Sequence, residues 1–366
     1  MINPRLLLVC CAPLVCRAGE PPSLSSGKET GKETPAAAAA SRWSYGASFQ
    51  TMQGIQVRFS GLGGLANPGV LPPPGGGSDY NYDDGFVRVD SSGNFDDRTW
   101  NWGYDSSSQF NPANGGIVTF SRSSGLADAS DSESGESASG IQFSAIYDGG
   151  PLPSSFPVPG DGVKWGARFS LNLLGGDVRS NGDLQASISR LEDTYALNGV
   201  VPPQSPWQDG SFQGPGPRIS DTPTRAAAPV IIPGGSTVAG FREVDLFLAS
   251  ADAGVFFTVP ITAKLSAGLE TGFTLAVASA DYDFLSITSM PGLPAQTTRG
   301  AGDDTSLLPG FYVGGNLDYR LNDRWSLHTA LRYQYLRSLS VQSGASSAEL
   351  DFHSAFTAIV GLEFKF

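Results

Sequence analysis

The feature that most constrains this chain is the alternation of apolar and polar residues over long segments. Because successive side chains of a strand point to opposite faces, such segments predict β-strands with one apolar and one polar face. Clear alternation covers residues 43–59, 163–173, 265–277, 311–319, 325–335 and 351–366. Weaker alternation covers 117–122, 139–148, 183–197 and 241–261. The chain is therefore predicted to be all-β, with about ten strands.

The connections between these segments alternate between short and long. Tight turns are expected at 260–264 and 321–324, whereas 198–237 and 285–308 are long and rich in Gly and Pro. Short turns at one rim and long loops at the other are typical of outer-membrane barrels, whose strands cross the hydrocarbon with about 9–11 tilted residues. Only 16% of the residues are charged, which is consistent with one face of each strand contacting lipid.

We therefore predict a closed antiparallel transmembrane β-barrel of about ten strands, within a range of about 8–12, with short periplasmic turns and long extracellular loops. A soluble secreted β-sandwich is the alternative, and it requires a second sheet to bury the apolar faces. The polar faces carry Arg, Glu, Asp and His in mid-strand. This placement of charge favours the barrel.

The N-terminus has the features of a secretory signal peptide over residues 1–18. Arg5 precedes an apolar stretch that ends at Val15, and Ala18 provides a small residue at the cleavage position. Cleavage there removes all three cysteines, so the exported chain cannot form disulfides. Residues 19–41 are a low-complexity arm, and 42–366 are assigned to the barrel, with a long loop insertion at about 61–116.

The chain ends in Gly361, two residues, Phe364, one residue and Phe366. This ending resembles the C-terminal insertion signal of bacterial outer-membrane β-barrel proteins, although Ile359 stands where that family has a polar residue. The resemblance implies a Gram-negative-type outer membrane, insertion by the barrel-assembly machinery and a periplasmic N-terminal arm. It also implies contact with outer-membrane lipid and lipopolysaccharide, and we expect a monomer. The net charge of −12 argues against nucleic acid as a partner.

Ionisable residues on the polar faces would line the lumen of such a barrel. They are Arg58, Lys164, Arg168, Glu270, Asp318, Arg320, Arg332, Asp351, His353 and Glu363. One interpretation is a narrow porin-like diffusion pore for small solutes. The other is a lumen filled by ion pairs, which we favour because barrels of about eight strands have filled interiors and open channels appear nearer 16 strands.

An acidic loop offers a candidate metal site. Asp79, Asn81, Asp83 and Asp90 stand at positions one, three, five and twelve of a calcium-type loop. The glycine that shapes such a loop comes one residue late, at Gly85, and the twelfth position lacks the usual Glu. The alternative is a hairpin turn at Asp84-Gly85. No other cofactor is expected.

A dense aromatic block follows at Thr99–Asp105. It is either a surface binding patch or a cap that packs over the barrel mouth. Catalysis is not expected. His328 and His353 are the histidines of the chain; Asp351 shares the face of His353, but no nucleophile does. We predict a non-catalytic protein that is structural or binds an unknown extracellular ligand through its loops. A barrel enzyme that acts on lipid A or peptides is the remaining alternative.

Overall fold

The computed structural model describes residues 42–64, 71–152, 162–208 and 217–366. The predicted signal peptide and the arm lie outside these residues. No helix among the described residues is long and apolar enough to cross a membrane. Two single-turn 3-10 helices, η1 (Ser107–Gln109) and η2 (Ala113–Gly115), occur. The predicted all-β class is thus confirmed for this part of the chain.

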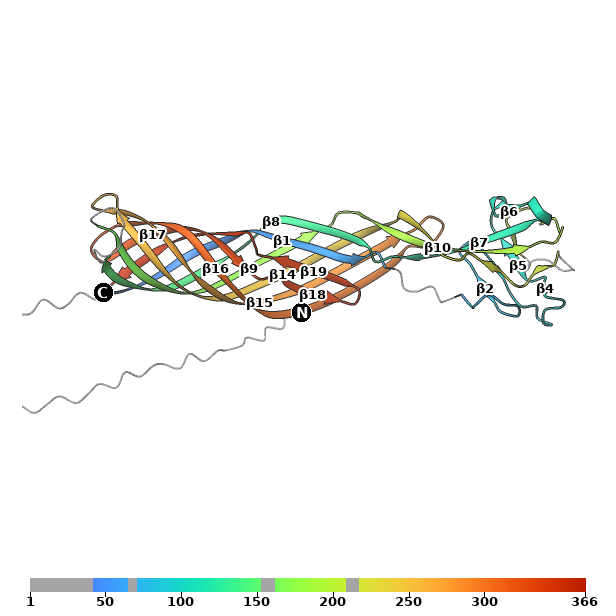
Figure 1. The fold of residues 1–366 in the computed structure, drawn as a ribbon, viewed down its shortest axis with the longest axis horizontal. Coiled ribbons are helices and arrows are strands. Elements are labelled where there is room, and N and C mark those ends of the chain that lie inside the picture. The colour runs from blue at the N-terminus through green and yellow to red at the C-terminus, as the bar shows by residue number, and fades with distance from the viewer. Residues whose placement is uncertain (1–41, 65–70, 153–161, 209–216) are drawn as a thin grey trace, which may run out of the picture. The chain divides into compact units, whose positions relative to one another are not determined.

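Eight long strands form a ring in which every neighbouring pair is antiparallel (Figure 1). In ring order they are β15 (Leu265–Ser289), β16 (Gln296–Arg320), β17 (Trp325–Leu336), β20 (Ala355–Lys365), β1 (Trp43–Leu62), β8 (Ala129–Pro151), β9 (Lys164–Ser180) and β14 (Val230–Pro260). The first strand pairs with the last, and β14 pairs with β15, which completes the ring. Eight lies within the predicted range, but the figure of about ten is not confirmed.

Two tight turns mark one end of the ring, which we call the short-turn end. They join β14 to β15 and β16 to β17, at 261–264 and 321–324. Beyond the opposite end, β7 (Ile117–Gly125) pairs with β10 (Leu184–Ala196), and β10 continues the sheet from β14. The hairpin of β18 (Leu339–Ser343) and β19 (Ser346–Asp351) extends the sheet next to β1.

Short strands in the predicted loop insertion and in residues 207–225 build a small outer domain together with β7 and β10. They are β2 (Tyr80–Asn81), β3 (Gly85–Val87), β4 (Arg98–Thr99), β5 (Trp102–Tyr104), β6 (Phe110–Asn111), β11 (Trp207–Gln208), β12 (Ile219–Ser220) and β13 (Thr224–Arg225). The domain has a core of its own, which includes Tyr82, Trp102, Tyr104, Phe120 and Tyr195. The aromatic block therefore packs inside this domain, because Trp102 and Tyr104 are buried there.

The faces of the ring strands change character along their length. Near the short-turn end, outward side chains such as Leu269 and Phe273 are apolar and exposed, while inward ones such as Glu270 are charged. Further along β15 the interior becomes apolar, as at Ala278 and Tyr282. A contiguous apolar core fills this far half of the ring.

Strand β1 changes face at a bulge. Gly54 has φ +83°, and the pairing of β1 with β8 shifts between Gln53 and Ile55. Before the bulge even-numbered residues are buried, and after it Ile55, like the odd-numbered residues that follow, is buried instead. One extra residue in a strand reverses which face its side chains take. The prediction that the apolar odd-numbered residues of 43–59 all lie on one face was therefore wrong.

Candidate functional site

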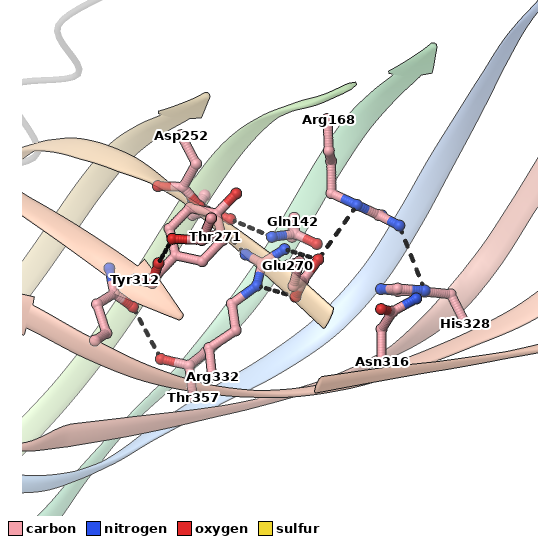
Figure 2. Close-up of polar contacts among 12 residues, drawn as sticks. Gln142, Arg168, Asp252, Glu270, Thr271, Tyr312, Asn316, His328, Arg332 and Thr357 are labelled. Atoms are coloured by element: carbon pink, nitrogen blue, oxygen red, sulfur yellow. Dashed lines mark hydrogen bonds and ion pairs between the residues drawn. The ribbon is translucent and has the colours of Figure 1, made fainter. Parts of the chain in front are cut away.

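Ionisable side chains gather inside the ring near its short-turn end (Figure 2). The lumen cluster consists of Arg168 on β9, Asp252 on β14, Glu270 on β15, Asp318 on β16, His328 and Arg332 on β17, and Glu363 on β20. Five of these seven were predicted to line the lumen together. Alternation places them on the inner face, and antiparallel register brings them to neighbouring heights.

Arg332 is the centre of one half of the cluster. The residue is 2% exposed, and its guanidinium donates to both oxygens of Glu270, with Nε 2.6 Å from Oε1 and Nη2 3.3 Å from Oε2. Asp252 Oδ2 lies 3.4 Å from Nη1 on another side. The ring of Tyr312 stacks on the same guanidinium at 4.5 Å. A charge this buried depends on its partners, because an unpaired ion inside a protein carries a desolvation cost of several kcal/mol.

Arg168 links this pair to a second group. Its Nη1 lies 3.0 Å from Glu363 Oε1, and its Nε lies 3.7 Å from Glu270 Oε2. His328 is fully buried, and its Nδ1 lies 2.6 Å from Asp318 Oδ1 and 3.5 Å from Glu363 Oε1. Acidic groups therefore alternate with cationic groups across the lumen.

Neutral polar side chains fill the space beside the ions. Gln142 Nε2 donates to Asn172 Oδ1 at 2.9 Å, and Asn172 Nδ2 donates to Asp252 Oδ2 at 2.9 Å. On the opposite wall, Thr357 donates to Gln334 Oε1 at 3.0 Å. These groups are buried, so the lumen at this level is packed with hydrogen-bonded side chains.

Glycines in the facing strands make room for the long cations. Gly314 stands opposite Arg332 in the β16–β17 register, and a Cβ there would lie 2.9 Å from Arg332 Cγ. Gly254 stands opposite Arg168 in the β9–β14 register, and a Cβ there would overlap the Tyr312 hydroxyl. Gly314 therefore leaves room for Arg332, and Gly254 leaves room for the Tyr312 ring that stacks on Arg332.

Asp318, His328 and Glu363 are the described residues whose ligand atoms lie close enough, within 4.8 Å, to suggest a metal ion. The fit is poor. The 2.6 Å distance between His328 Nδ1 and Asp318 Oδ1 is that of a hydrogen bond, and Arg168 already supplies positive charge to Glu363 at 3.0 Å. The geometry suits a hydrogen bond inside a polar network better than it suits a metal ion.

Three of the residues predicted in the lumen face outward instead. Arg58 is exposed because the Gly54 bulge reverses β1. Asp351 and His353 are partly exposed and pair with each other, with Oδ1 2.5 Å from Nδ1. The strand breaks between β19 and β20, so Phe352 is buried where these two residues were expected.

Lys164 and Arg320 lie at the edge of the lumen rather than inside it. Both are exposed and line a cavity at the short-turn end. Asp252 was not predicted from the sequence. Earlier on the same inner face, Leu246 and Leu248 are as apolar as the outward residues, so β14 alternates too weakly to reveal it.

Among the described residues, Asp79, Asp83 and Asp90 do not form a group whose ligand atoms lie within 4.8 Å of one another. Asp79 Oδ1 accepts from the Val89 amide, Asn81 Oδ1 accepts from Arg88, and Asp83 Oδ2 accepts from the Ser123 amide. Asp90 Oδ1 accepts from three donors, which are Thr99 Oγ1 and the amides of Trp100 and Asn101. The oxygens therefore hold backbone and side chains of the outer domain. The alternative hairpin is present, with Tyr80 paired to Val87.

The outer domain has a buried polar network of its own. The Tyr82 hydroxyl donates to Asp193 Oδ2 at 2.8 Å and lies 2.8 Å from the Tyr195 hydroxyl. Arg225 donates to both oxygens of Asp193, at 2.9 and 2.8 Å. Burial raises the pKa of the Tyr82 phenol well above its usual range. Burial also raises the pKa of Asp84, whose carboxylate accepts from the Ser121 amide and hydroxyl.

The C-terminal residues pack against the first strand at the short-turn end. A Cβ at Gly361 would overlap Ser48 Oγ and the Ala47 carbonyl, so the close approach of β20 to β1 requires a glycine. Phe364 contacts Trp325 with ring centroids 5.0 Å apart, and Phe366 contacts Tyr45 at 5.7 Å. These contacts give the three residues a structural role, and an insertion signal stays a prediction.

No family model matches this chain, and no curated protein does. Among solved structures, the outer membrane protease OmpT from Escherichia coli is similar over 91% of this chain and 100% of its own, with TM-score 0.34 and 8% identity. OprG from Pseudomonas aeruginosa has TM-score 0.28 and 8% identity over 88% of this chain and 97% of its own. Ail, the attachment invasion locus protein of Yersinia pestis, has TM-score 0.25 and 8% identity over 88% and 99%. Likeness this low assigns no activity.

Proposed function

We propose that this chain is an outer-membrane β-barrel protein with a filled lumen, which anchors the small outer domain at the cell surface and has no catalytic role. The observation that supports this proposal most strongly is the exposed apolar band on the outer wall near the short-turn end. Its exposed side chains include Phe143, Phe169, Leu269, Phe273, Leu275, Val313, Leu331 and Val360. An apolar surface of this extent is unfavourable in water and favourable against lipid.

Aromatic rings border this band on both sides. Trp43, Tyr45, Tyr147, Trp165, Tyr319, Trp325, Phe364 and Phe366 lie at the short-turn end. Phe311 contacts Tyr335, and Tyr333 contacts Phe356, at the other border. From Trp325 to Tyr335, strand β17 rises about 34 Å, which a tilt of about 40° reduces to about 26 Å across a bilayer. This height agrees with the apolar band of outer-membrane barrels.

The packed lumen supports an anchor rather than a pore. Arg168, Glu270 and Arg332 are each at most 3% exposed, and a contiguous apolar core follows further along the ring. A conducting path would have to displace both the lumen cluster and this apolar core. The non-catalytic assignment is supported by the two histidines, because His328 is fully buried and His353 pairs with Asp351 on the outer wall.

Two measurements test this function. We expect the chain to fractionate with outer membranes and to migrate on gels in a heat-dependent way, as folded barrels do. We also expect refolded protein in planar bilayers to give no stepwise conductance. Recovery as a soluble periplasmic protein would overturn the membrane assignment, and regular conductance steps would replace the anchor with the alternative narrow pore.

A further inference from the structure

A cavity of about 400 Å³ opens at the short-turn end of the ring, and we call it the short-turn mouth. Five cationic side chains line it, which are those of Lys164, Lys264, Arg320, Arg324 and Lys365. This concentration of positive charge stands out in a chain whose net charge is −12. The cations belong to three strands and two turns, so they meet only in the folded ring.

The two tight turns are built alike, and each contributes one of these cations. In the first, Thr262 Oγ1 accepts from the amide of Lys264 at 3.2 Å and from the next amide at 3.0 Å. In the second, Asn322 Oδ1 accepts from the amide of Arg324 and from the next amide, both at 2.9 Å. The same local hydrogen bonding therefore fixes a basic residue immediately before each of the two following strands.

Backbone hydrogen bonds then place the cations next to each other around the rim. The Arg320 amide donates to the Lys264 carbonyl at 2.7 Å, and the Lys365 amide donates to the Arg324 carbonyl at 2.9 Å. Lys164 opens β9 opposite Thr258, at the same end of the ring. The backbone of the rim thus holds the residues that carry these positive charges next to one another.

Carboxylates neutralise only part of this charge. Asp318 is bound by His328 at 2.6 Å and by Asn316 at 2.8 Å, and Asp148 lies 3.8 Å from Lys365. Asp323 also lines the cavity. Among the described residues, no carboxylate, that of Asp323 included, lies within ion-pair distance of the side chains of Lys164, Lys264, Arg320 and Arg324.

We propose that the short-turn mouth binds a phosphate-type oxyanion. Lys and Arg supply charge-assisted hydrogen bonds to phosphate oxygens, and several such donors converge here on one cavity. A volume of about 400 Å³ lies within the range of small-ligand pockets and accommodates a pyrophosphate-sized group. A soluble phosphate and the headgroup of an anionic phospholipid share this chemistry. The site does not depend on the function proposed above.

The test is calorimetric titration of the refolded full chain with inorganic pyrophosphate, in an uncharged detergent at low salt. We expect saturable binding that weakens as salt is raised, because salt screens exposed charges. The double variant Lys264→Gln/Arg324→Gln should bind at least about ten-fold more weakly. The matched control Arg58→Gln/Arg337→Gln also removes two exposed positive charges, but away from the cavity, and should bind as the parent does.

A second arm identifies the source of the oxyanion. The same variants are titrated with a short-chain phosphatidylglycerol below its micelle concentration. Tighter binding of this lipid than of pyrophosphate, lost in the cavity variant, assigns the mouth to a headgroup, and the reverse order assigns it to a soluble phosphate. The proposal is overturned if neither probe binds the parent, or if the control variant loses as much affinity as the cavity variant. Heat-dependent gel migration verifies that each variant is folded, and Lys164→Gln/Arg320→Gln repeats the test from the neighbouring strands.

Discussion

Both halves of the ring alternate apolar and polar residues along their strands, but the apolar residues face outward in one half and inward in the other. Near the short-turn end the apolar face is outside and the charged face is inside, as at Phe273 and Glu270 on β15. In the far half the inside is apolar, as at Tyr282, and the outside carries Asp281. The proposed membrane anchor accounts for the difference if each apolar face points away from water, to lipid in the first half and to the interior of the ring in the second.

The outer wall of the far half supports this view. Asp177, Asp245, Asp281 and Asp303 stand directly opposite one another on four adjacent strands. All four are exposed. Like charges that face each other across a sheet are destabilising, and water is the medium that weakens their repulsion most. A lipid environment at this level would therefore be energetically unfavourable.

The largest effect is expected from removing a charge inside the first half. Glu270→Leu leaves Arg332 and Arg168 without their shared carboxylate and should destabilise the folded ring by about 3–5 kcal/mol. The measurement is urea unfolding of the refolded protein in detergent. The control Glu243→Leu removes a partly exposed carboxylate on β14, whose partner Arg179 is 3.7 Å away and exposed, and should cost about 1 kcal/mol or less. Equal losses would mean that the lumen cluster is not a buried network.

An apolar truncation inside the far half should follow closely in size. Leu248 is fully buried and inward on β14. Leu248→Ala should cost about 2–5 kcal/mol because it removes buried methyl groups and leaves a cavity. Leu275 points outward on β15, in the apolar band. Leu275→Ala should therefore cost much less in the same unfolding assay. If the outward truncation costs more, the apolar core of the far half does not stabilise the ring.

A charge scan along the outer face of one strand locates the border between the halves. Leu275→Arg places a cation in the apolar band and should cost about 2–4 kcal/mol when the protein is unfolded from lipid vesicles. Ser279→Arg, four residues further on the same face, should cost about 0–1 kcal/mol. Both side chains point outward on β15. Equal costs at the two positions would contradict a border between lipid and water along this face of β15.

The smallest effect concerns the outer domain, which water surrounds. Burial raises the pKa of Asp84. A carboxyl with a raised pKa disfavours its charged form in the folded state, so folding gains stability as pH falls through that pKa and loses it as pH rises. Asp84→Asn should abolish this contribution, so the stability difference between variant and parent should shrink toward low pH. Limited proteolysis of the outer domain between about pH 4 and pH 7 measures it; a pH-independent difference would contradict the assignment.

Sequence patterns predicted the strands and the inward position of Arg168, Glu270 and Arg332, because regular alternation specifies a face without any knowledge of the partner strand. They could not predict where the side chains of one parity switch from the inner to the outer face of the ring. The extra residue at Gly54 turns Arg58 outward, and the interruption at 352–354 turns Asp351 and His353 outward. Both are local backbone events that leave the hydrophobic pattern unbroken. Asp252 escaped notice because Leu246 and Leu248, on the same inner face of β14, are as apolar as the outward Phe247 and Ala249.

The outer domain was the least predictable part. Its strands β2–β6 are two or three residues long, too short for a periodic signal. Their placement depends on contacts distant in the chain, such as Tyr82 with Asp193 and Trp102 with the carbonyl of Pro217. The acidic residues that looked like metal ligands turned out to hold these turns. Short-range sequence rules do not distinguish an oxygen that binds a cation from one that binds an amide.

The most direct test of the account compares two positions eight residues apart on the outer face of β15. The cysteines of the chain all lie within its first 16 residues, so Phe273→Cys and Asp281→Cys each introduce a single thiol into the ring. With the protein in lipid vesicles, a membrane-impermeant maleimide should label position 281 rapidly and leave position 273 unlabelled until detergent is added. Equal labelling of both positions before detergent would contradict the claim that lipid covers one half of the ring and water the other.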